Sequence, residues 1–224
     1  MPMQHAALKK RQREERASHP ENLALRVHRA LSWLERAEQL EDDPDGQFIF
    51  LWIAFNAAYA TEIDEAYRLS QQKSFVRFLG KLLELDRKRT IEGMLWTEFS
   101  GSIRVLLDNP YVFQDFWNFH NGTLPEEVWK RRFRDAKRSV FKAFERRNTL
   151  SVLAVVLTRV YTLRNQLMHG GATWRSSVNR SQLRDCNRFM MKLVPVVIEL
   201  MLDNTATLWG DACYPVVGGP VAVP

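Results

Sequence analysis

The sequence has few cysteines and no long hydrophobic run, and each shortage excludes a class of protein. Only two of the 224 residues are cysteine, Cys186 and Cys213, so there is no disulfide framework and no metal-ligand spacing. We expect Cys186 to act as a small apolar residue on a helix face. The most apolar run, residues 48–60, is interrupted by Asn56 and is too short to span a bilayer comfortably. This predicts a protein without a membrane partner.

Signal, strand and phosphate-loop patterns are absent as well. The first twenty residues contain no apolar segment of the kind that a secretory signal peptide has, so a cytoplasmic location is expected by default. No segment alternates apolar and polar residues between hairpin turns, and neither GxGxxG nor a P-loop occurs. Hydrophobic residues make up 46% and charged residues 26%, which is the balance of a globular protein. Together these features predict an all-α fold.

Apolar residues recur at helical spacing through most of the chain. The helix over 47–62 is apolar nearly all round, so we expect it at the centre of a bundle, with Asn56 hydrogen-bonded to a neighbouring helix. Periodicity is poorer after this helix, and about residues 65–145 are expected to form an insertion or side lobe. Further predicted helices cover about residues 18–39, 74–85, 90–107, 111–119, 125–147, 149–168 and 179–201.

The domain limits follow from composition. We predict a single helical domain over residues 18–209. A flexible basic arm, residues 1–17, precedes it, and a flexible tail rich in proline and glycine, residues 210–224, follows it.

Basic residues outnumber acidic ones, and much of the excess lies in two segments. The formal net charge of +6 favours polyanionic partners, nucleic acid first. One segment is the basic arm, and the other is residues 130–147, where nine lysines and arginines cover an amphipathic helix. That face is either a solvated helix surface or an RNA contact. The RNA contact would use Lys130, Arg131, Arg134, Lys137 and Arg138.

One group of polar residues stands at the end of an otherwise apolar helix, in the segment 162–171 (TLRNQLMHGG). Helical rotation separates Arg164 and His169 by about 140°. They can therefore act together only if the helix ends near His169, as the glycine pair that follows it indicates. An imidazole exchanges protons near neutral pH, and a helix C-terminus favours its cationic form. The structural alternative is that His169 caps the helix while Arg164 lies along the surface.

The string RNQLMHGG resembles the R-x4-6-H motif of HEPN domains, an all-helical superfamily that includes many ribonucleases. In that family the residue after the arginine is often polar, commonly asparagine, and Asn165 fits. The stretch 52–59 (WIAFNAAY) is similar to a helix of the Apea-like branch of HEPN proteins. The resemblance covers this helix and about residues 149–203, while residues 65–145 carry no family motif. It implies a HEPN-like helical bundle with a helical insertion.

The resemblance also implies a function, namely a metal-independent endoribonuclease of the toxin or defence type that needs no cofactor. The ribose 2′-hydroxyl would attack the adjacent phosphate. His169 would move a proton, Arg164 would bind the phosphate and stabilise its growing charge, and Asn165 would orient one of them. The implied partners are RNA and a second copy of the chain, because HEPN nucleases combine the arginines and histidines of a homodimer. An antitoxin or a nucleotidyltransferase is a further candidate partner.

Two other interpretations stay open. One is a HEPN module without catalysis that binds RNA, a nucleotide or a partner protein and contributes a dimer interface. The other is an unrelated helical scaffold in which the motif arose by chance. The arginine and histidine are necessary for the ribonuclease activity but not sufficient. The sequence therefore does not distinguish a HEPN ribonuclease from a HEPN module without catalysis.

Overall fold

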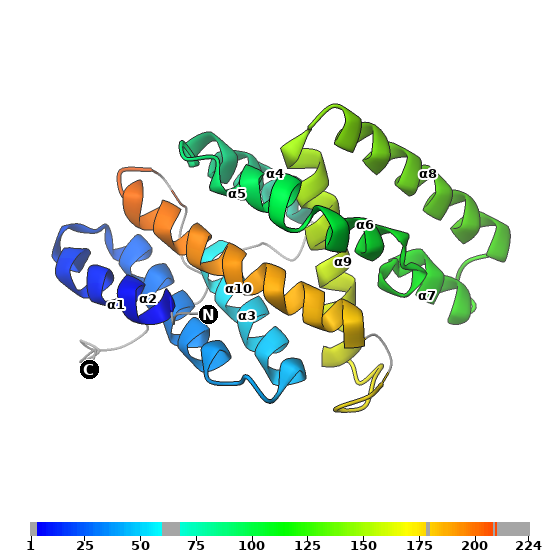
Figure 1. Ribbon diagram of the computed structural model, residues 1–224, viewed down its shortest axis with the longest axis horizontal. Coiled ribbons are helices and arrows are strands. Elements are labelled where there is room, and N and C mark those ends of the chain that lie inside the picture. The colour runs from blue at the N-terminus through cyan, green and yellow to red at the C-terminus, as the bar shows by residue number, and fades with distance from the viewer. Residues whose placement is uncertain (1–3, 60–67, 178–179, 208, 210–224) are drawn as a thin grey trace.

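The computed structural model describes residues 4–59, 68–177, 180–207 and 209, and all regular structure in these ranges is helical (Figure 1). The all-α fold class predicted from the sequence is confirmed. No helix of the described ranges combines the length and hydropathy needed to span a membrane. The helices are α1 (Gln4–Glu15), α2 (Glu21–Glu38), α3 (Pro44–Tyr59), α4 (Arg68–Leu85), α5 (Thr90–Gly93), α6 (Ser100–Asp108), α7 (Gln114–His120), α8 (Glu126–Glu145), α9 (Thr149–Met168) and α10 (Arg180–Asp203).

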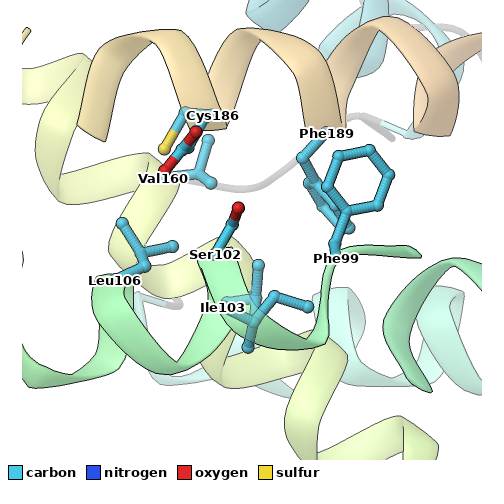
Figure 2. Close-up of a pocket in the computed structure, with 9 residues that line it drawn as sticks. Phe99, Ser102, Ile103, Leu106, Val160, Cys186 and Phe189 are labelled. Carbon is cyan, nitrogen blue, oxygen red and sulfur yellow. The ribbon is translucent and has the colours of Figure 1, made fainter. Parts of the chain in front are cut away.

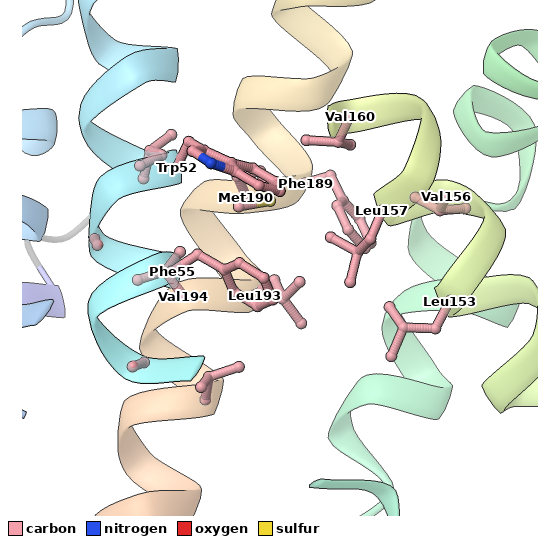
Figure 3. Packing of buried hydrophobic residues seen from close by; sticks show 14 of the residues in the cluster. Trp52, Phe55, Leu153, Val156, Leu157, Val160, Phe189, Met190, Leu193 and Val194 are labelled. Atoms are coloured by element: carbon pink, nitrogen blue, oxygen red, sulfur yellow. The ribbon is translucent and has the colours of Figure 1, made fainter. Parts of the chain in front are cut away.

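Helix α3 lies at the centre of the molecule, as its uniform apolar composition predicts. It packs against α2 and α10 along its length and contacts α9 (Figure 1). Figure 3 shows Phe55 of α3, Leu193 of α10 and Leu157 of α9 projecting toward the same interior, and all three are fully buried. Burying one side chain of this size contributes about 2 kcal/mol. Asn56 is only half-buried, and the hydrogen bond expected for it does not occur among the described residues.

The segment expected to form a separate lobe belongs largely to the same core. Leu79 and Leu82 of α4, Leu95 of the π-helical turn Met94–Glu98 and Ile103 of α6 are buried in one cluster with residues of α3, α9 and α10. Only α7 and much of α8 project to the side (Figure 1), and Val140 is the one buried residue of α8. Only this α7–α8 hairpin is left as a side lobe. Helices α4 and α6 belong to the core because they carry apolar residues at helical spacing.

Where the structure describes the expected flexible arm, from residue 4 onward, it is mostly a packed helix, which corrects the prediction of a flexible segment there. Helix α1 lies against α2 and α10, where His5 and Gln12 are buried and Leu8 packs on the core. The backbone N–H of His5 donates to Glu38 Oε1 at 2.9 Å. The segment is so polar overall that its sequence did not indicate a packed helix. Every third or fourth side chain (His5, Leu8 and Gln12) nevertheless faces the rest of the bundle. The predicted tail, 210–224, lies outside the described residues.

Candidate functional site at the C-terminal end of helix α9

Helix α9 ends where the glycine pair predicted. His169 is the C-cap residue, and Gly170 has a left-handed backbone with φ of +70°. The Gly171 N–H donates to the Gln166 carbonyl at 2.7 Å, and the Gly170 N–H donates to the Leu167 carbonyl at 3.3 Å. This pair of bonds is the Schellman ending, which satisfies carbonyl groups that the last turn would leave open. The chain therefore turns sharply after His169.

One face of α9 stays uncovered although most of the helix is core. Residues Leu153, Val156, Leu157, Val160 and Leu163 are at most 2% exposed. By contrast, Tyr161 is 47% and Met168 48% exposed, and Thr158 and His169 are also exposed, with Asn165 half-buried between them. From 100° per residue, these five residues lie within about 100° of one another around the helix axis. The polar residues of the motif therefore share a face with two large exposed side chains.

Arg164 lies at the edge of this face without a carboxylate partner among the described residues. Its Nη1 donates to Asn165 Oδ1 at 3.0 Å, while no described residue accepts a hydrogen bond from its buried Nε. Other arginines of the chain are neutralised, as Arg180 is by Asp45 at 2.8 Å. A half-buried guanidinium that keeps free N–H groups is suited to bind an anion. The structure thus joins Arg164 with Asn165 directly, and His169 follows one helical turn after Asn165.

The loop after α9 is held against the turn between α2 and α3. Buried Asp45 accepts two bonds from the Arg180 guanidinium, at 2.8 and 3.1 Å, and one from the Arg175 N–H at 3.2 Å. Trp174 Nε1 donates to Asp43 Oδ1 at 3.1 Å, and the Arg175 guanidinium lies 4.5 Å from the centre of the indole ring. These bonds hold Trp174 in place while its side chain remains 64% exposed. Trp174 is not among the residues predicted from the sequence, where its one signal is a tryptophan in a polar segment directly after the motif.

The predicted RNA-binding helix is α8, and its cations differ in their surroundings. Three of the five predicted residues pair with carboxylates of the same chain: Lys130 with Glu126 at 2.6 Å, Lys137 with Asp108 at 2.7 Å, and Arg138 with Asp135 at 3.7 Å. The other two, Arg131 and Arg134, are exposed and pair with no carboxylate in the described part of the chain. The pairing reduces the charge that α8 offers to a polyanion.

A second arginine of α9, Arg159, is buried with no carboxylate partner in the part of the chain that the structure describes. Arg159 is 4% exposed, and its guanidinium lies 4.4 Å from the centre of the Phe113 ring and 5.8 Å from that of Phe133. Burial lowers the pKa of Arg159 to about 10. Cation–π attraction to the two rings partly offsets the loss of hydration. Arg159 faces away from Arg164, so it supports the α7–α8 hairpin rather than the motif.

A small cavity lies between α6, α9 and α10 (Figure 2). Its α9 residues, Val156 and Val160, lie about 140–180° around the helix axis from Asn165. Its volume is about 10 Å³, no more than a water molecule needs, and its walls are almost wholly apolar. Cys186 lines it with Ile103 and Phe189. Burial raises the pKa of the Cys186 thiol to about 12, so the thiol is an unreactive small apolar group, as the sequence predicted.

No family model, no curated protein and no solved structure matches the chain. The HEPN resemblance of residues 52–59 and 149–203 therefore stays a prediction. Within the described ranges, no group of three His, Cys, Asp or Glu side chains is placed to hold a metal ion. The arrangement of Arg164, Asn165 and His169 at the end of α9 is therefore the basis for a proposed function.

Proposed function

We propose that the protein is a HEPN-like endoribonuclease of the toxin or defence type whose site lies at the C-terminal end of α9 and is completed by a second copy of the chain. The observation that carries this proposal is the state of Arg164. Its guanidinium has no carboxylate partner among the described residues and is hydrogen-bonded to Asn165, one helical turn before the exposed His169. A phosphate is the ligand that such a group prefers.

The chemistry divides between these side chains. Free N–H groups of Arg164 donate to the non-bridging oxygens of a phosphodiester and stabilise the negative charge that grows on them. The neutral His169 imidazole accepts the proton of the ribose 2′-hydroxyl, whose oxygen then forms a bond to phosphorus. The bond from phosphorus to the 5′-oxygen breaks, and that oxygen takes a proton from an imidazolium. The products are a 2′,3′-cyclic phosphate and a free 5′-hydroxyl.

A second copy of the chain supplies what one chain lacks. The reaction uses one imidazole as base and another as acid, whereas the motif of one chain supplies only His169. The uncovered face of α9 offers the means to pair two copies, because Tyr161 and Met168 flank the motif and are each nearly half exposed. Burying large apolar side chains against a symmetry-related copy favours association. Pairing along this face brings the motifs of both chains together.

The decisive experiment measures cleavage of labelled RNA in the presence of a chelator. Wild type is expected to cut the RNA, and His169→Ala and Arg164→Ala are each expected to slow cutting by roughly 10²-fold or more. Matched controls are His120→Ala and Arg77→Ala, which remove the same groups from exposed positions on α7 and α4. Circular dichroism shows whether each variant keeps its fold. Equal cutting by the motif variants and their controls would refute the proposal.

The second candidate is a HEPN-type module that binds RNA or a nucleotide without cutting it. Trp174 favours this reading, since its exposed ring, fixed by Asp43, offers a surface on which a base can stack. Wild type that binds RNA but cuts none, with weaker binding by Arg164→Ala, would establish the module in place of the enzyme.

A further inference from the structure

Three cations of the N-terminal segment lie on one side of it. Lys9 and Arg13 are four residues apart in α1, which is the spacing of one helix face, and Arg16 begins the 3₁₀ turn Arg16–Ser18 directly after the helix. Arg13 and Arg16 are exposed and Lys9 is half-buried. No carboxylate lies within ion-pairing distance of these three side chains among the described residues. This face therefore carries positive charge that no ion pair of the described residues neutralises.

The other two cations of α1 show that this is not a general property of the helix. Lys10 lies 4.0 Å from Glu14. Arg11 pairs with Glu15 at 2.8 Å and with Asp203 of α10 at 2.6 Å. Glu14 and Glu15, the acidic residues of this segment, thus pair with Lys10 and Arg11 and not with Lys9, Arg13 or Arg16.

His28 of α2 completes the cluster. Its Nδ1 lies 3.2 Å from Lys9 Nζ. An ammonium group only donates, so Nδ1 accepts and the neutral ring carries its proton on Nε2. Burial first, and then the charges of Lys9, Arg16 and Arg29, lower the pKa of His28. The pKa of Lys9 is also lowered, by burial and by Arg13 and Arg16, against an opposing effect of Glu35.

From this geometry we propose that Lys9, Arg13, Arg16 and His28, the α1–α2 cluster, bind a phosphate group. Two guanidinium forks, one ammonium and one imidazole N–H supply donors for several phosphate oxygens. The fold holds like charges close together, and an anion would convert that repulsion into attraction. The phosphate belongs either to a free anion or to an RNA backbone. Figure 1 places α1 at the opposite end of the bundle from the loop that follows α9, so the two sites are separate.

Two probes identify the source of the phosphate. Inorganic pyrophosphate is titrated while the His28 imidazole is followed by NMR, and bound anion is expected to raise the pKa of His28 by about one unit. A labelled single-stranded RNA of about 12 nucleotides is titrated in parallel by fluorescence anisotropy at fixed salt. Binding of pyrophosphate alone assigns the site to a free anion. Binding of RNA that pyrophosphate displaces assigns it to the RNA backbone.

Matched variants then test the cluster itself. Arg13→Gln and Arg16→Gln are each expected to weaken binding about tenfold, because each removes a charge-assisted hydrogen bond. The control is Lys10→Gln, which removes the same charge from the same helix at a residue that pairs with Glu14. An equal loss in the control would reduce the effect to net charge and overturn the proposal, as would failure of both probes to bind. His169→Ala is expected to leave pyrophosphate binding unchanged, so this result does not depend on the proposed nuclease.

Discussion

At the scale of single residues, Arg159 is the clearest electrostatic cost in the molecule. The guanidinium is buried against Phe113 and Phe133, and its pKa is lowered to about 10. The unfolded chain therefore holds this proton more tightly than the folded chain does. The cost is fully present below pH 10 and falls as the pH rises above 10, so stability rises with pH in that window. A shift of this size corresponds to a cost on the order of 3 kcal/mol, against which the ring contacts act.

Replacing Arg159 with methionine should therefore stabilise the fold. Methionine keeps the apolar contact with both rings and removes the buried charge. We expect the free energy of unfolding at pH 7 to rise by about 1 kcal/mol or more, measured by urea denaturation. The gain over wild type should shrink above pH 10. The exposed Arg77→Met serves as control, and a destabilised Arg159→Met would mean that the ring contacts outweigh desolvation.

At the scale of elements, the ending of α9 controls where the motif residues lie. Gly170 adopts a φ of +70°, which costs other residues about 1 kcal/mol or more. At Gly171 an added Cβ atom would lie 3.1 Å from the Gln166 carbonyl oxygen. Side chains at either position would disturb the Schellman bonds and shift His169.

Gly170→Ala is thus expected to affect stability and cleavage together. We expect the free energy of unfolding to fall by about 1–2 kcal/mol and RNA cleavage to fall by more than this loss explains, because His169 moves. Gly101→Ala is the matched control, since a Cβ there meets open space and the residue lies inside α6. Unfolding curves and cleavage rates are measured for both variants, so that the loss of cleavage can be compared with the loss of stability. Unchanged cleavage by folded Gly170→Ala would show that the sharp ending is not needed.

At the scale of the whole molecule, the fold leaves one face of a core helix uncovered. Helix α9 packs on its other sides against α3, α4, α6 and α8, yet Tyr161 and Met168 remain nearly half exposed. A bundle of this size could have covered these side chains with a neighbouring helix. The uncovered face is explained if a second copy of the chain covers it, which the proposed composite site also needs.

If the proposed dimer pairs through this face, a charge on the face should separate the two copies. Tyr161→Asp and Met168→Asp are each expected to convert the dimer into a monomer, as measured by light scattering, and to abolish RNA cleavage. The circular dichroism spectrum of each variant should remain helical. The control is Val105→Asp, because Val105 is 57% exposed on α6. Full cleavage by a monomeric Tyr161→Asp protein would contradict the composite site.

Much of the fold could be predicted, because helices depend on patterns within a few residues. The helix predicted over 149–168 has the same limits as α9, and the glycine pair marked its end. Helix α1 was missed because its support comes from far along the chain, through Glu38 and Asp203. In the candidate site, Arg164, Asn165 and His169 were proposed from the motif. Trp174 was not, since Asp43 fixes it from 131 residues away.

The helical class, the central place of α3 and the end of α9 follow from the amino-acid sequence alone, because they depend on apolar periodicity and on the backbone freedom of glycine. The tertiary structure decided which charges are neutralised. It pairs Arg180 with Asp45 and Arg11 with Asp203, and it leaves Arg164 and Arg159 without a carboxylate among the described residues. Ion pairs depend on distances of a few ångströms between segments far apart in the chain, and only the folded packing sets those distances.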